Sequence, residues 1–183
     1  MKLVIPNFDQ FKAFAKRHRN VEANPQKVDV AWFIATKFPF KVPFIIDTDR
    51  MGWSAKEQAL ILPPNDNVMT VIHEAWHYFM APPEMLNYDN FGLGTPAGGQ
   101  GLQDVYMRPS EADDEEEAVC YFTIATARKL RVPIPAIMDE MEYANLSDGF
   151  IHEKSDGRSN YLKILGLSAR RDLSRFGFEI EYA

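Results

Sequence analysis

Apolar residues recur along most of this chain at the three- and four-residue spacing of amphipathic helices. The clearest stripe follows Asn7 and consists of Phe8, Phe11, Phe14 and Ala15. The pattern predicts helices at residues 8–19, 25–37, 67–80, 110–131, 135–146 and 159–176. Helices therefore make up the larger part of the predicted structure.

Two short apolar, partly β-branched runs at residues 42–47 and 58–62 predict strands. The segment between them contains Asp49 and Gly52, which favours a turn and antiparallel pairing. A further strand is predicted where apolar and acidic residues alternate at positions 178–182. We therefore expect an α+β fold, with a helix-rich body and a short antiparallel sheet.

Composition limits the class of protein. A chain of 183 residues with 46% hydrophobic residues is the size of a single domain spanning 1–183, and its net charge of −6 argues against a surface that binds nucleic acid. It has no apolar stretch near the length of a membrane span and no signal-like start, and Cys120 is its only cysteine. We expect a soluble cytoplasmic protein without membrane or nucleic-acid partners.

The candidate chemistry lies in the helix predicted at residues 67–80, which contains His73, Glu74 and His77 in an H-E-x-x-H arrangement. Side chains four positions apart share a helical face, so both imidazoles can bind one metal ion. Glu74 lies about 100° around the helix, beside the ion, where it can act as a general base. The motif predicts a catalytic metal centre.

A catalytic zinc ion usually has three protein ligands, so a third must come from elsewhere in the chain. The longer pattern with a third histidine is absent, because Pro83 occupies that position. The third ligand can instead come from the acidic run at the start of the helix predicted at residues 110–131. The rest of that helix is apolar and therefore buried, so a carboxylate that faces inward needs a partner. Helical phase alone leaves three candidates open, which are Asp113, Glu116 and Glu117.

The strand at residues 59–62, the histidine motif and the later segment Glu117-Ala118-x-x-Tyr121 together resemble the zincin metallopeptidases with a glutamate ligand, above all the ImmA/IrrE-type peptidases. This resemblance covers roughly residues 44–130 and implies that Glu117 is the third ligand. It also implies zinc as the cofactor and a protein or peptide as the substrate.

The chain also resembles the elongation factor P hydroxylase family, which has the same motif followed by an aromatic residue, here Tyr78. That family has a D-F-G-Y-like segment, matched here by residues 90–93, and then an acidic stretch entering a helix. The chain departs from the pattern at Asn90 and Leu93. This resemblance implies iron in place of zinc and hydroxylation of a protein side chain, and it makes Asp113 a rival for the third ligand.

Three functions are therefore compared. As a zinc metallopeptidase, the protein would hold the ion with His73, His77 and Glu117, use Glu74 as general base, and bind an extended peptide along the strand at residues 59–62. Tyr106, Tyr121 and His152 are the candidates for stabilising the oxyanion. As an iron (Fe²⁺) hydroxylase it would hold the ion with His73, His77 and a carboxylate, and Glu74 would have no obligatory role as a base. The third function is that of a non-catalytic zincin-like binding protein, which the intact Glu74 disfavours.

Overall fold

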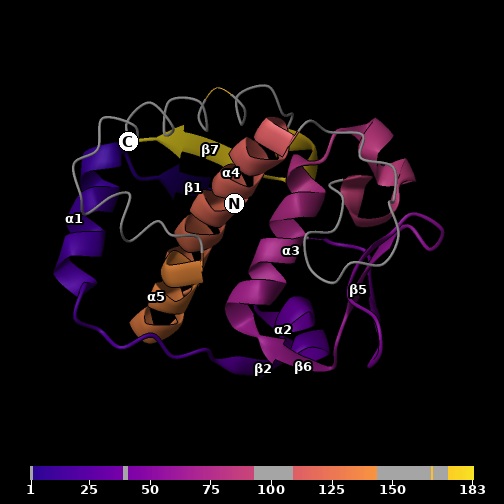
Figure 1. Ribbon diagram of the computed structural model, residues 1–183, viewed down its shortest axis with the longest axis horizontal. Coiled ribbons are helices and arrows are strands. Elements are labelled where there is room, and N and C mark those ends of the chain that lie inside the picture. Colours follow the sequence, from indigo (N-terminus) through magenta and orange to yellow (C-terminus); the bar gives the residue numbers. More distant parts are fainter. Residues whose placement is uncertain (1, 39–40, 93–108, 144–165, 167–172) are drawn as a thin grey trace.

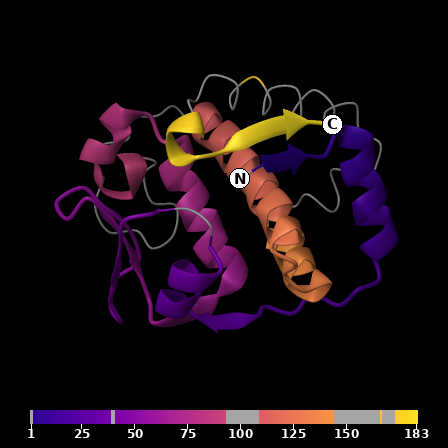
Figure 2. The same cartoon turned by 180° about the vertical axis from the view of Figure 1, so that it is seen from behind.

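The computed structural model describes residues 2–38, 41–92, 109–143, 166 and 173–183. Two helices, α3 (Val68–Met80) and α4 (Pro109–Lys129), pack side by side at its centre (Figures 1 and 2). α5 (Ile134–Tyr143) contacts both of them. In both views α1 (Phe8–His18) lies on the side of α4 that faces away from α3. The buried apolar side chains of these helices belong to one hydrophobic cluster.

The remaining elements are short. The strands are β1 (Lys2–Ile5), β2 (Lys27–Asp29), β3 (Phe44–Ile46), β4 (Gly52–Ser54), β5 (Ala59–Leu62), β6 (Asn65–Asn67) and β7 (Glu179–Tyr182). The other helical segments are α2 (Val30–Thr36), η1 (Pro83–Asn87), η2 (Asp89–Gly92) and η3 (Leu173–Phe176). This mixture of helices and small sheets confirms the predicted α+β class. None of the helices in the described ranges is both long and apolar enough to cross a membrane.

The strands of the described residues form three small sheets. β1 pairs in parallel with β7, β2 pairs antiparallel with β6, and β5 lies between β3 and β4. β3 runs parallel to β5 with Phe44 opposite Leu60, whereas β4 runs antiparallel with Trp53 opposite that same residue. The three-stranded sheet is thus mixed in direction, whereas the other two are parallel and antiparallel, respectively.

The prediction of a purely antiparallel pairing between residues 42–47 and 58–62 is wrong, because β4 occupies the antiparallel side of β5. It lies in the connection between the two predicted strands, and β3 is left to pair in parallel on the other side. β5 is therefore a central strand with all four side chains buried. The suggested role of residues 59–62 as an open edge for a peptide is also wrong, since both edges are already paired.

The predicted helices at 8–19, 67–80, 110–131 and 135–146 correspond to α1, α3, α4 and α5. The second predicted helix starts later than expected, because its first residues form β2 and Asp29 caps α2 by accepting a hydrogen bond from the Trp32 amide at 2.8 Å. β7 matches the predicted terminal strand. Most of the helix predicted at 159–176 lies outside the described residues, and β1 was not predicted.

The segment that follows α3 is fixed against β4. Trp53 donates its indole N–H to the carbonyl of Leu86 at 3.0 Å, and Asp89 accepts a hydrogen bond from the Ala55 amide at 2.8 Å. Gly52 has a φ of +107°, and a Cβ there would lie 2.2 Å from Oδ1 of Asn90. The next residue, Phe91, is buried and stacks on Trp53, and its ring centroid lies 6.0 Å from that of His77 in α3.

Candidate metal centre

The helix α3 brings His73 and His77 together as their spacing predicts. Asn67 caps the helix by accepting a hydrogen bond from the Met69 amide at 3.1 Å, and its side-chain amide donates to Asp139 on α5 at 2.9 Å. Both imidazoles are buried, with 6% of each residue exposed. Their Nε2 atoms lie 3.1 Å apart, so the two rings present these nitrogens to one point.

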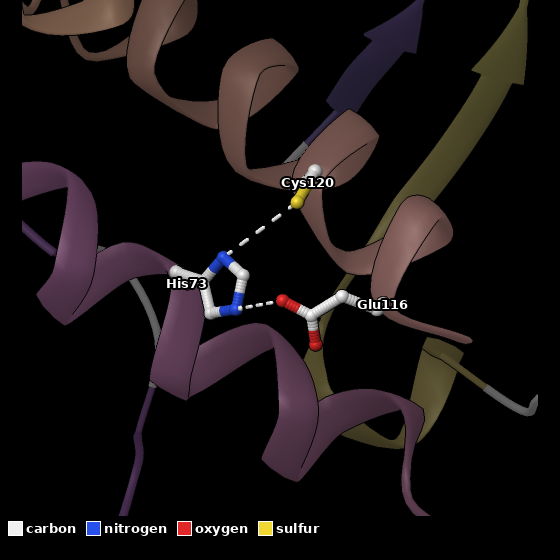
Figure 3. A group of neighbouring side chains, drawn as sticks. All are labelled: His73, Glu116 and Cys120. Atoms are coloured by element: carbon white, nitrogen blue, oxygen red, sulfur yellow. Dashed lines mark hydrogen bonds and ion pairs between the residues drawn. The ribbon is translucent and has the colours of Figure 1, made fainter. Parts of the chain in front are cut away.

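The carboxylate that faces both histidines is Glu116 of α4. Its Oε1 lies 3.1 Å from Nε2 of His73, and its Oε2 lies 3.1 Å from Nε2 of His77. Figure 3 shows Glu116 reaching from α4 towards the His73 ring on α3. The helix pair α3 and α4 thus gathers two nitrogens and a carboxylate in one place.

The spacing of these donor atoms fits a metal ion. Ligand atoms bound to tetrahedral zinc at about 2.0–2.1 Å lie roughly 3.3–3.4 Å from one another. The distances between the two Nε2 atoms and from each to a Glu116 oxygen are all 3.1 Å. Two imidazoles and one carboxylate are also the donor set of catalytic zinc sites and of non-haem iron sites.

A second carboxylate supports His73 from behind. Nδ1 of His73 donates to Oε1 of Glu140 on α5 at 2.8 Å, and Glu140 is itself buried. Histidines that bind metals usually donate their second N–H to such an acceptor, which fixes the ring and leaves the other nitrogen free to bind. This contact therefore directs Nε2 of His73 to the point where Glu116 and His77 meet.

Cys120 lies on the other side of the same ring. Its Sγ is 3.9 Å from Nδ1 of His73, and Figure 3 shows the thiol and the Glu116 carboxylate at opposite nitrogens of the imidazole. His73, Glu116 and Cys120 form a compact group of potential ligands. Because Nδ1 already donates to Glu140, we assign the metal-binding role to Nε2 and exclude Cys120 from the ligand set.

The electrostatics of the site favour a cation. Burial lowers the pKa of His73, but hydrogen bonds to Cys120, Glu116 and Glu140 outweigh it and hold that pKa well above its usual value of 6.5. Burial raises the pKa of the Glu116 carboxyl, but its contacts with His73 and His77 prevail and hold that pKa below its usual range. The carboxylates thus attract positive charge to the imidazoles, and a metal ion would replace a proton there.

Burial instead dominates at the thiol, because it raises the pKa of Cys120 to about 11. The same group is almost fully covered, with 1% of the residue exposed. A thiol must lose its proton to bind a metal, so this raised pKa is a second reason to leave Cys120 out of the ligand set.

Glu74 and His73 line the same cavity. The cavity has a volume of about 470 Å³, and its wall includes His73, Glu74, Asp139 and Glu140. On the other flank of the site the Phe91 ring stacks near the imidazole of His77, with centroids 6.0 Å apart. Among the described residues Nδ1 of His77 is buried and has no hydrogen-bond partner. Nδ1 of His77 therefore lacks the support that Glu140 gives to His73, and His77 is positioned by the contact of its Nε2 with Glu116 and by the Phe91 ring.

The other predicted site residues have different positions. Glu117 follows Glu116 on α4, about 100° around the helix, and is half-buried. The side chain of Asp113 lies outside the described part of the molecule, as do Tyr106 and His152. Tyr121 is fully buried and stacks on Phe11 at 4.2 Å, which indicates a packing role.

Sequence analysis missed Glu140. A signal was present, because this acidic residue falls three positions after Ile137 and next to Met141 on the apolar face of a predicted helix. A buried carboxylate needs a partner. The sequence analysis considered this requirement for the acidic run of α4 but not for α5.

Comparisons with known protein families, with curated protein sequences and with solved structures found no match to this chain. The geometry of the site is therefore the basis for the functional argument.

Proposed function

We propose that this protein is a metal-dependent hydrolase of the zincin type, with zinc as the metal and a protein or peptide as the substrate. The observation that carries the proposal is the convergence of donor atoms, in which the Nε2 atoms of His73 and His77 lie 3.1 Å apart and each lies 3.1 Å from a different oxygen of the Glu116 carboxylate. The third ligand is thus Glu116 in this proposal, in place of the Glu117 that the resemblance to the peptidases implied.

A zinc ion held by these side chains would lower the pKa of a water molecule and polarise the carbonyl of the bond to be cleaved. Glu74 lines the same cavity as His73 and is the group that takes the proton of the attacking water and passes it to the leaving amine. Glu140 holds His73 in the tautomer that leaves Nε2 unprotonated when the ion binds. The cavity of about 470 Å³ beside these residues is the space for the substrate.

The first test is elemental analysis of protein purified without a metal-binding tag. We expect one equivalent of zinc in the wild type and its loss in His77→Ala. Glu116→Gln and Glu117→Gln form a matched pair, because they remove the same charge from neighbouring positions of α4. Zinc lost only in Glu116→Gln supports the assignment, and zinc lost only in Glu117→Gln contradicts it.

The second test separates binding from catalysis. Glu74→Gln should retain zinc and lose hydrolysis of a peptide library, because the amide cannot accept the proton of water. Hydrolysis that survives this substitution would contradict the mechanism.

An iron-dependent hydroxylase acting on a protein side chain is the second candidate, because two histidines and one carboxylate also form the facial triad of non-haem iron oxygenases. Iron in the wild type, lost in Glu116→Gln, would favour this function. An oxygenase does not need Glu74 as a base, so its activity should persist in Glu74→Gln. A wild type that binds neither metal would instead indicate a zincin-like binding protein.

A further inference from the structure

A second cavity lies on the side of α4 that faces away from the candidate metal centre. It has a volume of about 560 Å³ and lies among β1, α1 and α4. Figures 1 and 2 show β1 running between the two helices. Arg128 follows Glu116 by twelve positions along α4, which corresponds to about 18 Å. The two cavities are therefore separate.

Three cationic side chains line this cavity, Arg17 from α1 and Arg128 and Lys129 from the last turn of α4. None of the described residues that line it is acidic. Within the described part of the chain, these three groups form no ion pair with a carboxylate. The net charge of the protein is −6, so a group of cations without a carboxylate partner among the described residues runs against its overall composition.

The guanidinium of Arg128 is held in place by an aromatic ring. It lies over Phe14, 4.7 Å from the ring centroid. The ring covers one face of the planar group and leaves the N–H groups at its edge available for another partner. Burial lowers the pKa of Arg128, and the nearby charge of Arg17 lowers it further. The fold thus brings two guanidinium groups together against their mutual repulsion, which a bound anion would offset.

The floor of the cavity is apolar. Leu3, Phe14 and Ala125 contribute to its lining, and all three are buried. Its volume falls within the range of about 300–1,000 Å³ that is usual for sites of small organic ligands. A ligand that matches this cavity has an anionic group that contacts the three cationic side chains and an apolar body that packs against the floor.

We infer that this cavity binds a small organic phosphomonoester. The phosphate dianion matches the local excess of positive charge better than a carboxylate does, and its oxygens suit the forked N–H groups of Arg128. The organic body lies against Leu3 and Phe14. This site is independent of the proposed metal centre and of the reaction proposed there.

The probe for the test is phenyl phosphate, titrated into the 183-residue chain and followed by calorimetry and by amide chemical shifts. We expect saturable binding that is tighter than that of inorganic phosphate or phenol. Arg128→Gln and Arg17→Gln should each weaken it roughly tenfold, as expected for loss of a charge-assisted hydrogen bond. Arg128→Lys, which keeps the charge but not the fork, should give an intermediate loss.

Two further variants serve as controls. Arg175→Gln removes the same charge from an arginine that also stacks on a phenylalanine, Phe176, but lies outside the cavity lining, and it should leave binding unchanged. Ala13→Trp fills the cavity from an exposed position of α1 and should abolish binding without altering any charge. Circular dichroism of each variant verifies that it is folded.

Absence of saturable binding of phenyl phosphate would overturn the inference. So would an equal loss in Arg175→Gln and Arg128→Gln, because binding would then reflect overall charge. A short oligonucleotide or an acidic peptide that binds where phenyl phosphate does not would assign the surface to a different partner and would also contradict the inference.

Discussion

Nδ1 of His73 donates to the carboxylate of Glu140 at 2.8 Å, across 67 positions of sequence and between two different helices. Both side chains are buried, so the contact is shielded from water and its loss would leave an unpaired polar atom in the core. It determines which nitrogen of His73 faces Glu116. The packing of α5 against α3 therefore orients His73 in the candidate metal centre.

Glu140→Gln should weaken zinc binding by about 10- to 100-fold, the usual effect of removing a carboxylate that supports a metal-bound histidine. Competition with a chromophoric chelator measures the affinity. Asp139→Asn is the matched control, because Asp139 lines the same cavity and its neutralisation removes the same charge without touching His73. Equal affinities of Glu140→Gln and Asp139→Asn would show that charge, and not the orientation of His73, is the cause.

The pKa shifts at the site predict how the metal-free protein responds to pH. The raised pKa of His73 contributes stability that is complete below the usual value of 6.5 and is lost as pH rises through the folded value. The lowered pKa of Glu116 contributes stability that is present above its usual value of 4.5 and is lost as pH falls through the folded value. Both contributions to the stability of the fold are complete only between pH 4.5 and pH 6.5.

In chelator-treated protein, Tm should therefore decline as pH rises above 6.5. With zinc present this decline should be smaller, since the ion replaces the proton that is lost. Thermal unfolding from pH 5 to 9 tests both expectations. His18→Gln, a change outside the site next to Phe14, should keep the decline, and a flat Tm in the metal-free wild type would contradict the prediction.

Gly52→Ala should destabilise the fold. The φ of +107° costs about 1–3 kcal/mol for a residue with a side chain. The added Cβ would also lie 2.2 Å from Oδ1 of Asn90. Urea unfolding measures the loss. In an Asn90→Gly background the overlap is gone, so Gly52→Ala should cost less there, and an equal cost in both backgrounds would exclude the overlap as a cause.

The buried hydrogen bond between α3 and α4 should contribute measurably to stability. Nε1 of Trp76 donates to Oγ1 of Thr126 at 2.9 Å, and Thr126→Val leaves this N–H unpaired at a cost of about 1–3 kcal/mol. Thr123 is equally buried on the same helix, but its Oγ1 has no partner among the described residues. Thr123→Val should therefore be neutral or stabilising. Equal losses in the two variants, measured by urea unfolding, would contradict this account.

Periodicity was sufficient to predict α1, α3, α4 and α5, because each has a long apolar pattern and most have clear end signals. It was insufficient for the sheets. β4 is three residues long and begins at Gly52, which indicates a turn when only the sequence is considered. Strand direction then depends on which neighbour lies on each side of β5, and this is decided by tertiary packing.

The two histidines could be predicted because they lie on one turn of a single helix, where spacing fixes geometry. Glu116 and Glu140 lie on other helices, and their approach depends on how α4 and α5 rotate against α3. After its acidic run α4 is apolar on nearly every side, so no stripe indicates which carboxylate faces inward. Sequence reasoning could therefore supply the candidates but could not decide among them.

The burial of Cys120 between α3 and α4 makes it possible to measure how these two helices separate. Its thiol is almost fully covered by α3 and its surroundings, and its pKa of about 11 keeps it protonated at neutral pH. Alkylating reagents react with the exposed thiolate, so they modify this residue only when the two central helices separate. Because the chain has no other cysteine, each labelled molecule reports one such opening. When alkylation is faster than closing, the labelling rate thus gives the rate at which the centre of the molecule opens.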